Sequence, residues 1–133
     1  MPQLAKGGKW VFGWCLAGPT CDLQIPPEAY IEYGFQQGEA AIILRGSRRS
    51  EGIAIGRLAK LQGSILQSRF VGEITIGTNG RVTLPPEAGI QPGERLLVVR
   101  GSGLALGFLR CGPIIEEALK HPELKLYETT CHS

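Results

Sequence analysis

A five-residue motif occurs twice in this chain and constrains its fold more than any other feature. Residues 25–29 read IPPEA, and residues 84–88 read LPPEA, 59 positions later. Further along, the RGS of residues 45–47 recurs at residues 100–102, now 55 positions later. Matches that keep their order and almost keep their spacing indicate an internal duplication. The chain is therefore predicted to contain two related units.

The second unit shows most clearly which structure is repeated. Apolar and polar residues alternate at 74–76 and again at 82–84, the period of a half-buried strand. Asn-Gly at 79–80 lies between them and is a strong hairpin signal, because both residues tolerate positive φ. The double proline that follows must end the second strand, since proline has no amide hydrogen. Residues 95–100 (RLLVVR) then predict a buried strand, and residues 104–109 a returning one.

The first unit is four residues longer after its double proline. There PPEAYIEYG (26–34) predicts a short helix that begins at the prolines and ends at Gly34 as a left-handed cap, whereas the second unit has only GIQPG at 89–93. The last strand of each unit aligns GIAIG (52–56) with GLALG (103–107).

Upstream matches predict which residues of the first strands are buried. Cys15 and Ala17 fall on Ile74 and Ile76, with the shift of 59, and all four are predicted core positions.

These patterns divide the chain into four segments. They are unit 1 (8–58), a connector (59–70), unit 2 (71–110) and a C-terminal region (111–133). In the last region, Pro113 to His121 predicts a helix with an apolar stripe, ended by Pro122, and the remainder is predicted to be a loose tail.

The ordered motifs resemble the AbrB/MazE/SpoVT family of swapped-hairpin DNA-binding domains. The resemblance is carried by a glycine-arginine turn, a valine-x-leucine-proline strand, a short helix, a proline-glycine turn and two more strands, present between 76 and 109 and, with a fuller helix, in IPPEAYIEYGFQQGE (25–39). It implies an all-β fold with short helices, a β-barrel in which two units interleave their hairpins. Because the chain carries two units, the two copies are expected to form one pseudo-dimeric barrel.

The same resemblance implies where DNA would bind. Positive residues in and beside the first turn contact DNA in that family, a role that falls here on Arg81, with Asn79 beside it. An ordinary polar residue after a turn is an equally good interpretation of Arg81. Unit 1 has Asp22 at the matching position, and an acidic residue facing phosphate is unfavourable. DNA binding is therefore expected to be weak or one-sided.

A second basic stretch completes the candidate DNA-binding residues. Arg45, Arg48 and Arg49 lie in and before the last turn of unit 1. A solvated turn is the favoured interpretation of such a charge run. The net charge of +2 gives no general polycation signal.

Neither catalysis nor a bound cofactor is expected from the sequence. His121 and His132 are the only histidines, and both lie outside the repeats. No nucleophile, base and orienting group stand out. The spacing of Cys15 and Cys21 does not suit a zinc site, and Cys111 and Cys131 are distant, so free thiols are expected.

These observations lead to two functional expectations. The first is a cytoplasmic DNA-binding transcriptional regulator or antitoxin-like protein, without a membrane span and without enzymatic activity. The alternative is a protein-interaction module on the same fold, with a partner bound through the helix from Pro113 to His121. Whether the chain also forms a homodimer is left open.

Overall fold

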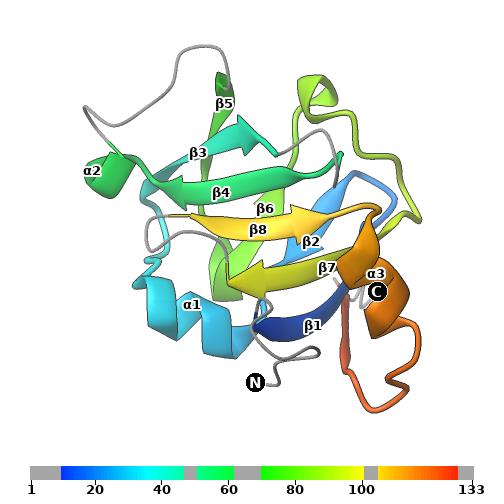
Figure 1. The fold of residues 1–133 in the computed structure, drawn as a ribbon. Coiled ribbons are helices and arrows are strands. Elements are labelled where there is room, and N and C mark those ends of the chain that lie inside the picture. The colour runs from blue at the N-terminus through cyan, green and yellow to red at the C-terminus, as the bar shows by residue number, and fades with distance from the viewer. Residues whose placement is uncertain (1–9, 47–50, 62–69, 101–104, 129–133) are drawn as a thin grey trace.

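The computed structural model describes residues 10–46, 51–61, 70–100 and 105–128, which form a mostly β protein with a few short helices (Figure 1). The elements of unit 1 and the helix after it are, in order, β1 (Val11–Leu16), β2 (Asp22–Gln24), α1 (Pro27–Tyr33), β3 (Ala40–Arg45), β4 (Ile53–Arg57) and α2 (Leu58–Leu61). The later elements are β5 (Phe70–Thr75), η2 (Thr78–Gly80), β6 (Arg81–Thr83), η3 (Pro86–Ala88), β7 (Arg95–Arg100), β8 (Leu106–Leu109), α3 (Pro113–Ala118) and β9 (Leu126–Glu128).

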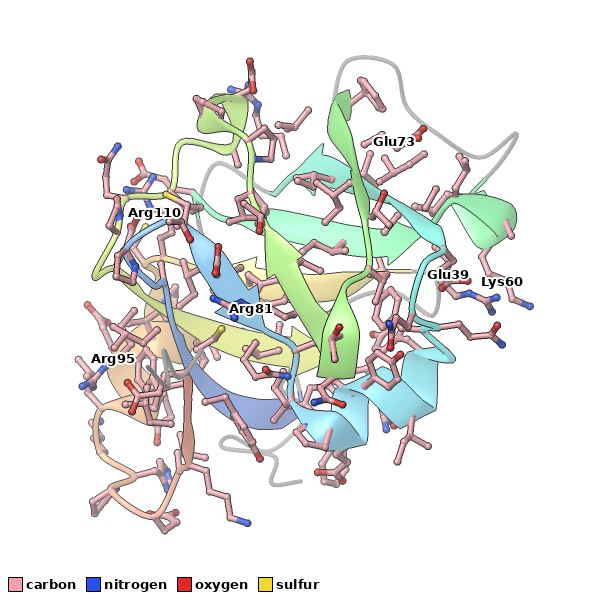
Figure 2. The ribbon with its side chains drawn as sticks, turned by 180° about the vertical axis from the view of Figure 1, so that it is seen from behind. Glu39, Lys60, Glu73, Arg81, Arg95 and Arg110 are labelled. Atoms are coloured by element: carbon pink, nitrogen blue, oxygen red, sulfur yellow. The ribbon has the colours of Figure 1, made fainter. Side chains whose placement is uncertain are left out.

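The strands form two sheets. Seven strands follow the order β5-β3-β4-β8-β7-β1-β9, and β2 pairs with β6 in a second sheet. This small sheet lies behind the large one in Figure 1 and in front of it in Figure 2. The large sheet is mixed, because β9 runs parallel to β1. Over the described residues it is an open sheet, so a closed barrel is not confirmed.

The first strand of each unit pairs with the third strand of the other unit. β1 is antiparallel to β7, with Cys15 opposite Leu96. β5 is antiparallel to β3, with Ile74 opposite Ala41. Because Cys15 matches Ile74 and Ala41 matches Leu96 in the repeat, the two pairings have the same register. Both also contain a register shift at the equivalent place. The two units are thus interleaved and related by a pseudo-twofold axis.

The fourth strands, β4 and β8, pair with each other and correct the sequence alignment of the repeat. Ile42 lies opposite Gly56, and the equivalent Leu97 lies opposite Leu109. Gly56 therefore corresponds to Leu109, 53 positions later. The alignment of GIAIG with GLALG is wrong by two residues. A slip of two keeps every side chain on its face of the sheet, so the alternation could not reveal the error.

The Asn79-Gly80 segment makes the predicted turn but not the predicted hairpin. Both residues have positive φ, 56° and 81°. However, β5 pairs with β3 and β6 pairs with β2, so the strands on either side of the turn are not partners. The amide of Gly77 instead donates to the carbonyl of Arg81 across the turn, at 2.8 Å. The hairpin prediction is wrong because a turn signal is local, whereas both strands find their partners in the other unit.

The main core fills the space between the sheets. Its buried side chains come from both units and include Leu23, Ile43, Ile55, Val82, Leu96, Val98, Leu106 and Phe108. The four predicted core positions, Cys15, Ala17, Ile74 and Ile76, are confirmed as buried. Truncating Phe108 to alanine is expected to cost about 3–5 kcal/mol of stability, since it is fully buried.

A second, smaller core lies on the outer face of the large sheet. Val11 and Trp14 of β1 and Leu97 and Val99 of β7 pack there against Ala118 of α3. Ile114 and Ile115 pack at its margin. The predicted helix is confirmed from Pro113, but as an α-helix it ends at Ala118, three residues before His121.

The C-terminal segment contains a strand where a loose tail was predicted. β9 pairs with β1 in parallel, with Tyr127 opposite Cys15. The amide of Trp14 donates to the carbonyl of Lys125 at 2.8 Å. The prediction was wrong because β1 offers an edge whose amides and carbonyls need partners. β9 takes that edge.

The difference in helix length between the units is confirmed. α1 spans Pro27–Tyr33 and ends at Gly34 with φ 72° and ψ 25°, the predicted left-handed cap. In unit 2 the same place holds η3, a single turn from Pro86 to Ala88 that ends at Gly89 with φ 73°. Both caps use glycine because residues that carry a side chain rarely adopt this left-handed backbone conformation. The chain thus leaves the small sheet in the same way in both units, and only unit 1 continues for a further helical turn.

Candidate functional site

Arg81, the leading DNA-binding candidate, is bound to an acidic residue of the other unit. Its Nε lies 2.9 Å from Oδ2 of Asp22, and its Nη2 contacts the same oxygen. Thr20 and Thr83 donate to Oδ1 of Asp22, at 2.5 and 3.2 Å. Asp22 is buried, while 43% of the Arg81 side chain is exposed. Figure 2 shows Arg81 on the side of the molecule formed by β2 and β6.

The position of this ion pair follows from the pseudo-symmetry. Leu23 lies opposite Val82 in the β2-β6 pair, and these residues are equivalent in the repeat. The axis therefore passes through this pair of strands. Asp22 and Arg81 are equivalent too, so each is the counterpart of the residue that it binds. If both units carried the same residue here, two like charges would meet.

The polar contacts of Asp22 together favour its ionised form. The hydrogen bond from Thr20 lowers the pKa of Asp22 most, and Arg81 and Thr83 lower it further, against the effect of burial. A negatively charged carboxylate therefore lies in direct contact with the guanidinium of Arg81.

Asn79 lies in the η2 turn, beside the ion pair. Its side chain is exposed, and its backbone carbonyl accepts a hydrogen bond from Nε2 of Gln24 at 2.6 Å. Its positive φ serves the turn. Nothing in this geometry gives the residue a role beyond the turn.

Arg45 lies elsewhere, at the end of β3 in the large sheet, so the structure does not bring it together with Arg81 of the small sheet. Arg48 and Arg49, the other two candidates, lie outside the described residues. Arg45 is exposed. Within the described part of the chain, no ion pair or hydrogen bond involves its side chain.

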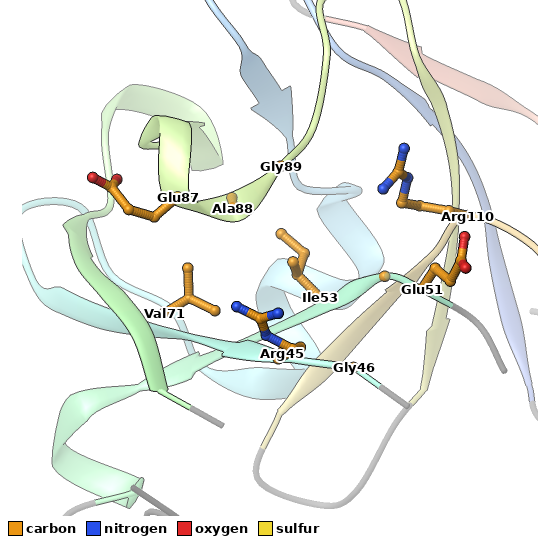
Figure 3. Close-up of a pocket in the computed structure, with 10 residues that line it drawn as sticks. Arg45, Gly46, Glu51, Ile53, Val71, Glu87, Ala88, Gly89 and Arg110 are labelled. Atoms are coloured by element: carbon orange, nitrogen blue, oxygen red, sulfur yellow. The ribbon is translucent and has the colours of Figure 1, made fainter. Parts of the chain in front are cut away.

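Arg45 borders a cavity that has a volume of about 480 Å³. The lining residues come from the ends of β3 and β8, the start of β4, β5 and the η3 turn; they are Arg45, Gly46, Glu51, Gly52, Ile53, Val71, Glu87, Ala88, Gly89 and Arg110. Figure 3 shows Arg45, Ile53 and Val71 directed toward Ala88 across the cavity, with Glu87 directed away from it.

The shorter turn of unit 2 explains this cavity. At the equivalent place in unit 1, the sequence inserts the last four residues of α1, 30–33. There Glu32 binds Arg100, the counterpart of Arg45, with Oε2 at 2.8 Å from Nε. The hydroxyl of Tyr33 donates to the carbonyl of Ala105 at 3.2 Å. These contacts fill the place in one half of the molecule, and the equivalent place in the other half is the open cavity.

The frame around the two places is the same. Arg57 binds Glu39 in one half, with Nε 2.9 Å from Oε1, and the equivalent Arg110 contacts Glu94 in the other. In each turn the glutamate also accepts a hydrogen bond from the amide three residues before it. The surrounding structure is therefore the same in both halves. The cavity exists because one half lacks a helical turn, and not because the fold is distorted there.

The C-terminal helix does not present its apolar stripe to a partner. Ile114, Ile115 and Ala118 pack into the second core. Leu119 alone of the predicted stripe is largely exposed, at 66%. Partner binding through this helix stays a prediction, but it would have to use other side chains.

None of the described cysteines is joined in a disulfide. Cys15 is buried, and burial raises the pKa of its thiol to about 11, so it is a core residue at neutral pH. Cys21 donates to the carbonyl of Ile90 at 3.2 Å. Among the described residues no three His, Cys, Asp or Glu side chains are grouped as metal ligands would be. Cys131 and His132 lie outside these residues.

Sequence reasoning missed both the ion pair and the cavity, although each had a signal. Oppositely charged residues stand at equivalent positions of the repeat, and the four-residue difference in length falls on a helix that has a packing role.

None of the helices within the described ranges is long and apolar enough to span a membrane. No protein-family model matches the chain, and no curated protein matches it in sequence.

Proposed function

We propose that this chain is a fused, swapped-hairpin domain of the AbrB/MazE/SpoVT type that works as a protein-interaction module in the cytoplasm, without catalytic activity. The observation that carries the proposal is the Asp22–Arg81 ion pair. In this pair the buried carboxylate of Asp22 binds Arg81, the residue to which the resemblance assigns DNA contact.

The strand pairing supports the swapped-hairpin part of the proposal. Each unit gives its first strand to the third strand of the other, in the same register. Two chains that exchanged hairpins would pair in this way. Joining them in one chain makes assembly independent of concentration, because the second unit is always at hand.

The electrostatics of the small sheet support an interaction role other than DNA binding. Phosphate contacts supply most of the affinity of proteins for DNA, and each needs an available positive charge. Here the arginine on the axis is matched by an aspartate, and the net charge of the chain is only +2. The open cavity beside Arg45 is a site better suited to a partner segment.

DNA binding through the basic stretch is the second candidate. Arg45 is exposed and, in the described residues, unpaired, and Arg48 and Arg49 follow it in the sequence. Such binding would use one side of the molecule and would be weak and sensitive to salt.

Binding to a random 20-base-pair duplex, measured by fluorescence anisotropy across a salt series, tests the proposal. The native protein should bind no more tightly than a Kd of about 10⁻⁴ M at 0.15 M salt. Asp22→Asn keeps the shape but releases Arg81, and should bind more tightly, with a log-log salt slope steeper by about 0.9. Submicromolar binding of the native protein that Arg81→Ala abolishes would contradict the proposal.

A further inference from the structure

We propose that the cavity beside Arg45 binds a helical turn of a partner protein that carries a single glutamate followed by a tyrosine. This deepens the proposed function and rests on it, because it names the partner chemistry of the interaction module. The molecule contains its own example of the complex, the last turn of α1 in unit 1.

The template is defined by two contacts of α1. Glu32 binds Arg100 at the end of β7, and Tyr33 packs at the margin of the main core while its hydroxyl reaches the carbonyl of Ala105. Arg100 and Arg45 end equivalent strands, and the β3-β4 and β7-β8 pairs have the same register. A turn that extended η3 of unit 2 over the end of β3 and the start of β4, as α1 of unit 1 lies over the end of β7 and the start of β8, would therefore bring its carboxylate to Arg45.

The charges of the cavity match this occupant. Arg45 has no partner among the described residues, so its guanidinium donors are available to a carboxylate, which it can bind at two points. Arg110 already contacts Glu94. Glu51 lines the cavity as well, and its carboxylate disfavours a second negative charge. The ligand is thus expected to carry one acidic group. A run of acidic residues and a phosphate chain are both disfavoured.

The apolar lining matches the rest of the turn. Val71 and Ala88 provide a surface for an aromatic ring, beside the buried side chain of Ile53. Four residues complete slightly more than one helical turn, which is the length that unit 1 has and unit 2 lacks. The volume of about 480 Å³ lies in the range of ordinary ligand pockets. The carbonyl of Gly52, counterpart of the Ala105 carbonyl, already accepts the amide of Gly46 at 2.8 Å. A tyrosine hydroxyl of the ligand is therefore not expected to bind this carbonyl, and the proposal rests on the carboxylate and the aromatic ring.

A labelled peptide taken from the chain itself is the direct probe. Residues 26–34, PPEAYIEYG, are made with capped ends and a side-chain lactam joining positions 27 and 31, because Pro27 and Ile31 are exposed in α1 and an isolated peptide of this length is not helical. Anisotropy against the full-length protein should give a Kd on the order of 0.1–1 mM. Glu32→Gln in the peptide, or Arg45→Ala in the protein, should weaken binding about tenfold.

Arg100→Ala is the matched control, because its site is filled by α1 and should not take the peptide. Unchanged binding by this variant is the expected result. Binding that Arg100→Ala weakens and Arg45→Ala does not would mean that the peptide displaces α1, and would overturn the inference. The absence of peptide binding at about 2 mM protein, above the weakest expected Kd of about 1 mM, would also overturn the inference.

Failure of this inference can be told from failure of the proposed function. If neither the peptide nor duplex DNA binds, the assigned partner chemistry is wrong while the interaction role stands. If DNA binds tightly through Arg81, the proposed function itself is wrong.

Discussion

The two halves of this molecule share a frame and differ in what covers it. Both have the same strand register, the same glycine caps and the same arginine–glutamate pair beside the second turn. The half that carries α1 has its cavity filled by Glu32 and Tyr33, and the outer edge of β1 is covered by β9. The half that carries η3 has an open cavity, and among the described strands β5 pairs only with β3.

This difference shows what fusion of two units permits. In a symmetric dimer each residue on the axis meets its own copy. In one chain the two positions can diverge, and here they have become Asp22 and Arg81. The same freedom lets one half complete its packing while the other has an open cavity.

The largest expected effect breaks the frame at a position where the halves differ. A Cβ added to Gly52 would lie 1.8 Å from the backbone oxygen of Phe108, whereas the equivalent Ala105 already carries one. Gly52→Ala should therefore destabilise the protein by about 3 kcal/mol or more, and Ala105→Gly by only about 1 kcal/mol. Urea denaturation of both variants checks this. Equal effects would mean that the two positions are not related as the register implies.

A charge exchange on the axis comes next. Asp22→Arg alone places two arginines together in a largely buried site and should cost about 3 kcal/mol. Adding Arg81→Asp restores opposite charges at equivalent positions, and should recover at least about 1 kcal/mol. The measurement is a double-mutant cycle from urea denaturation. A double variant that is no more stable than Asp22→Arg would show that the axis does not accept the exchange.

The response to acid should depend on Asp22. Its pKa is lowered in the folded protein, so its ionised form stabilises the fold above the pKa of an unfolded aspartate, about 4. That contribution is lost as the pH falls below about 4 toward the folded pKa. The difference in unfolding free energy between the native protein and Asp22→Asn should therefore be constant from pH 7 to 5 and shrink below pH 4. A constant difference down to pH 3 would contradict the assignment.

The smallest effects test the part that the halves share. Glu39→Gln and Glu94→Gln each break one arginine–glutamate pair, in which both partners are partly buried. Each should cost about 1 kcal/mol, and the two costs should agree within about 0.5 kcal/mol. Thermal unfolding at matched salt compares them. A cost confined to one of the two variants would show that the frames are not equivalent in energy.

Local features were predictable from the sequence because they depend on neighbouring residues. The cap at Gly34, the helix start at Pro113 and the buried strand from 95 to 100 all follow from short patterns and are confirmed. The duplication was predictable for a different reason, since the same pattern is written twice.

Long-range features could not be obtained in this way. The turn at Asn79 does not reveal that β6 pairs with β2, more than fifty residues away. The slip of two residues in the fourth strand is invisible to an alternating pattern, and the edge that β9 covers exists only once β1 has paired with β7. The cavity also depends on long-range pairing, because its walls come from β3 and β4 of unit 1 and from β5 and the η3 turn of unit 2.

The interleaving of the two units is the central claim, and solution NMR of the full chain tests it most directly. Cross-strand proton contacts should join Trp14 to Leu97 and, equally, Glu73 to Ile42, as the two registers require. Isotope-filtered spectra of a mixed labelled and unlabelled sample should show that both sets arise within one chain. Contacts that instead join β1 to β3 and β5 to β7, each unit pairing with itself, would contradict the account.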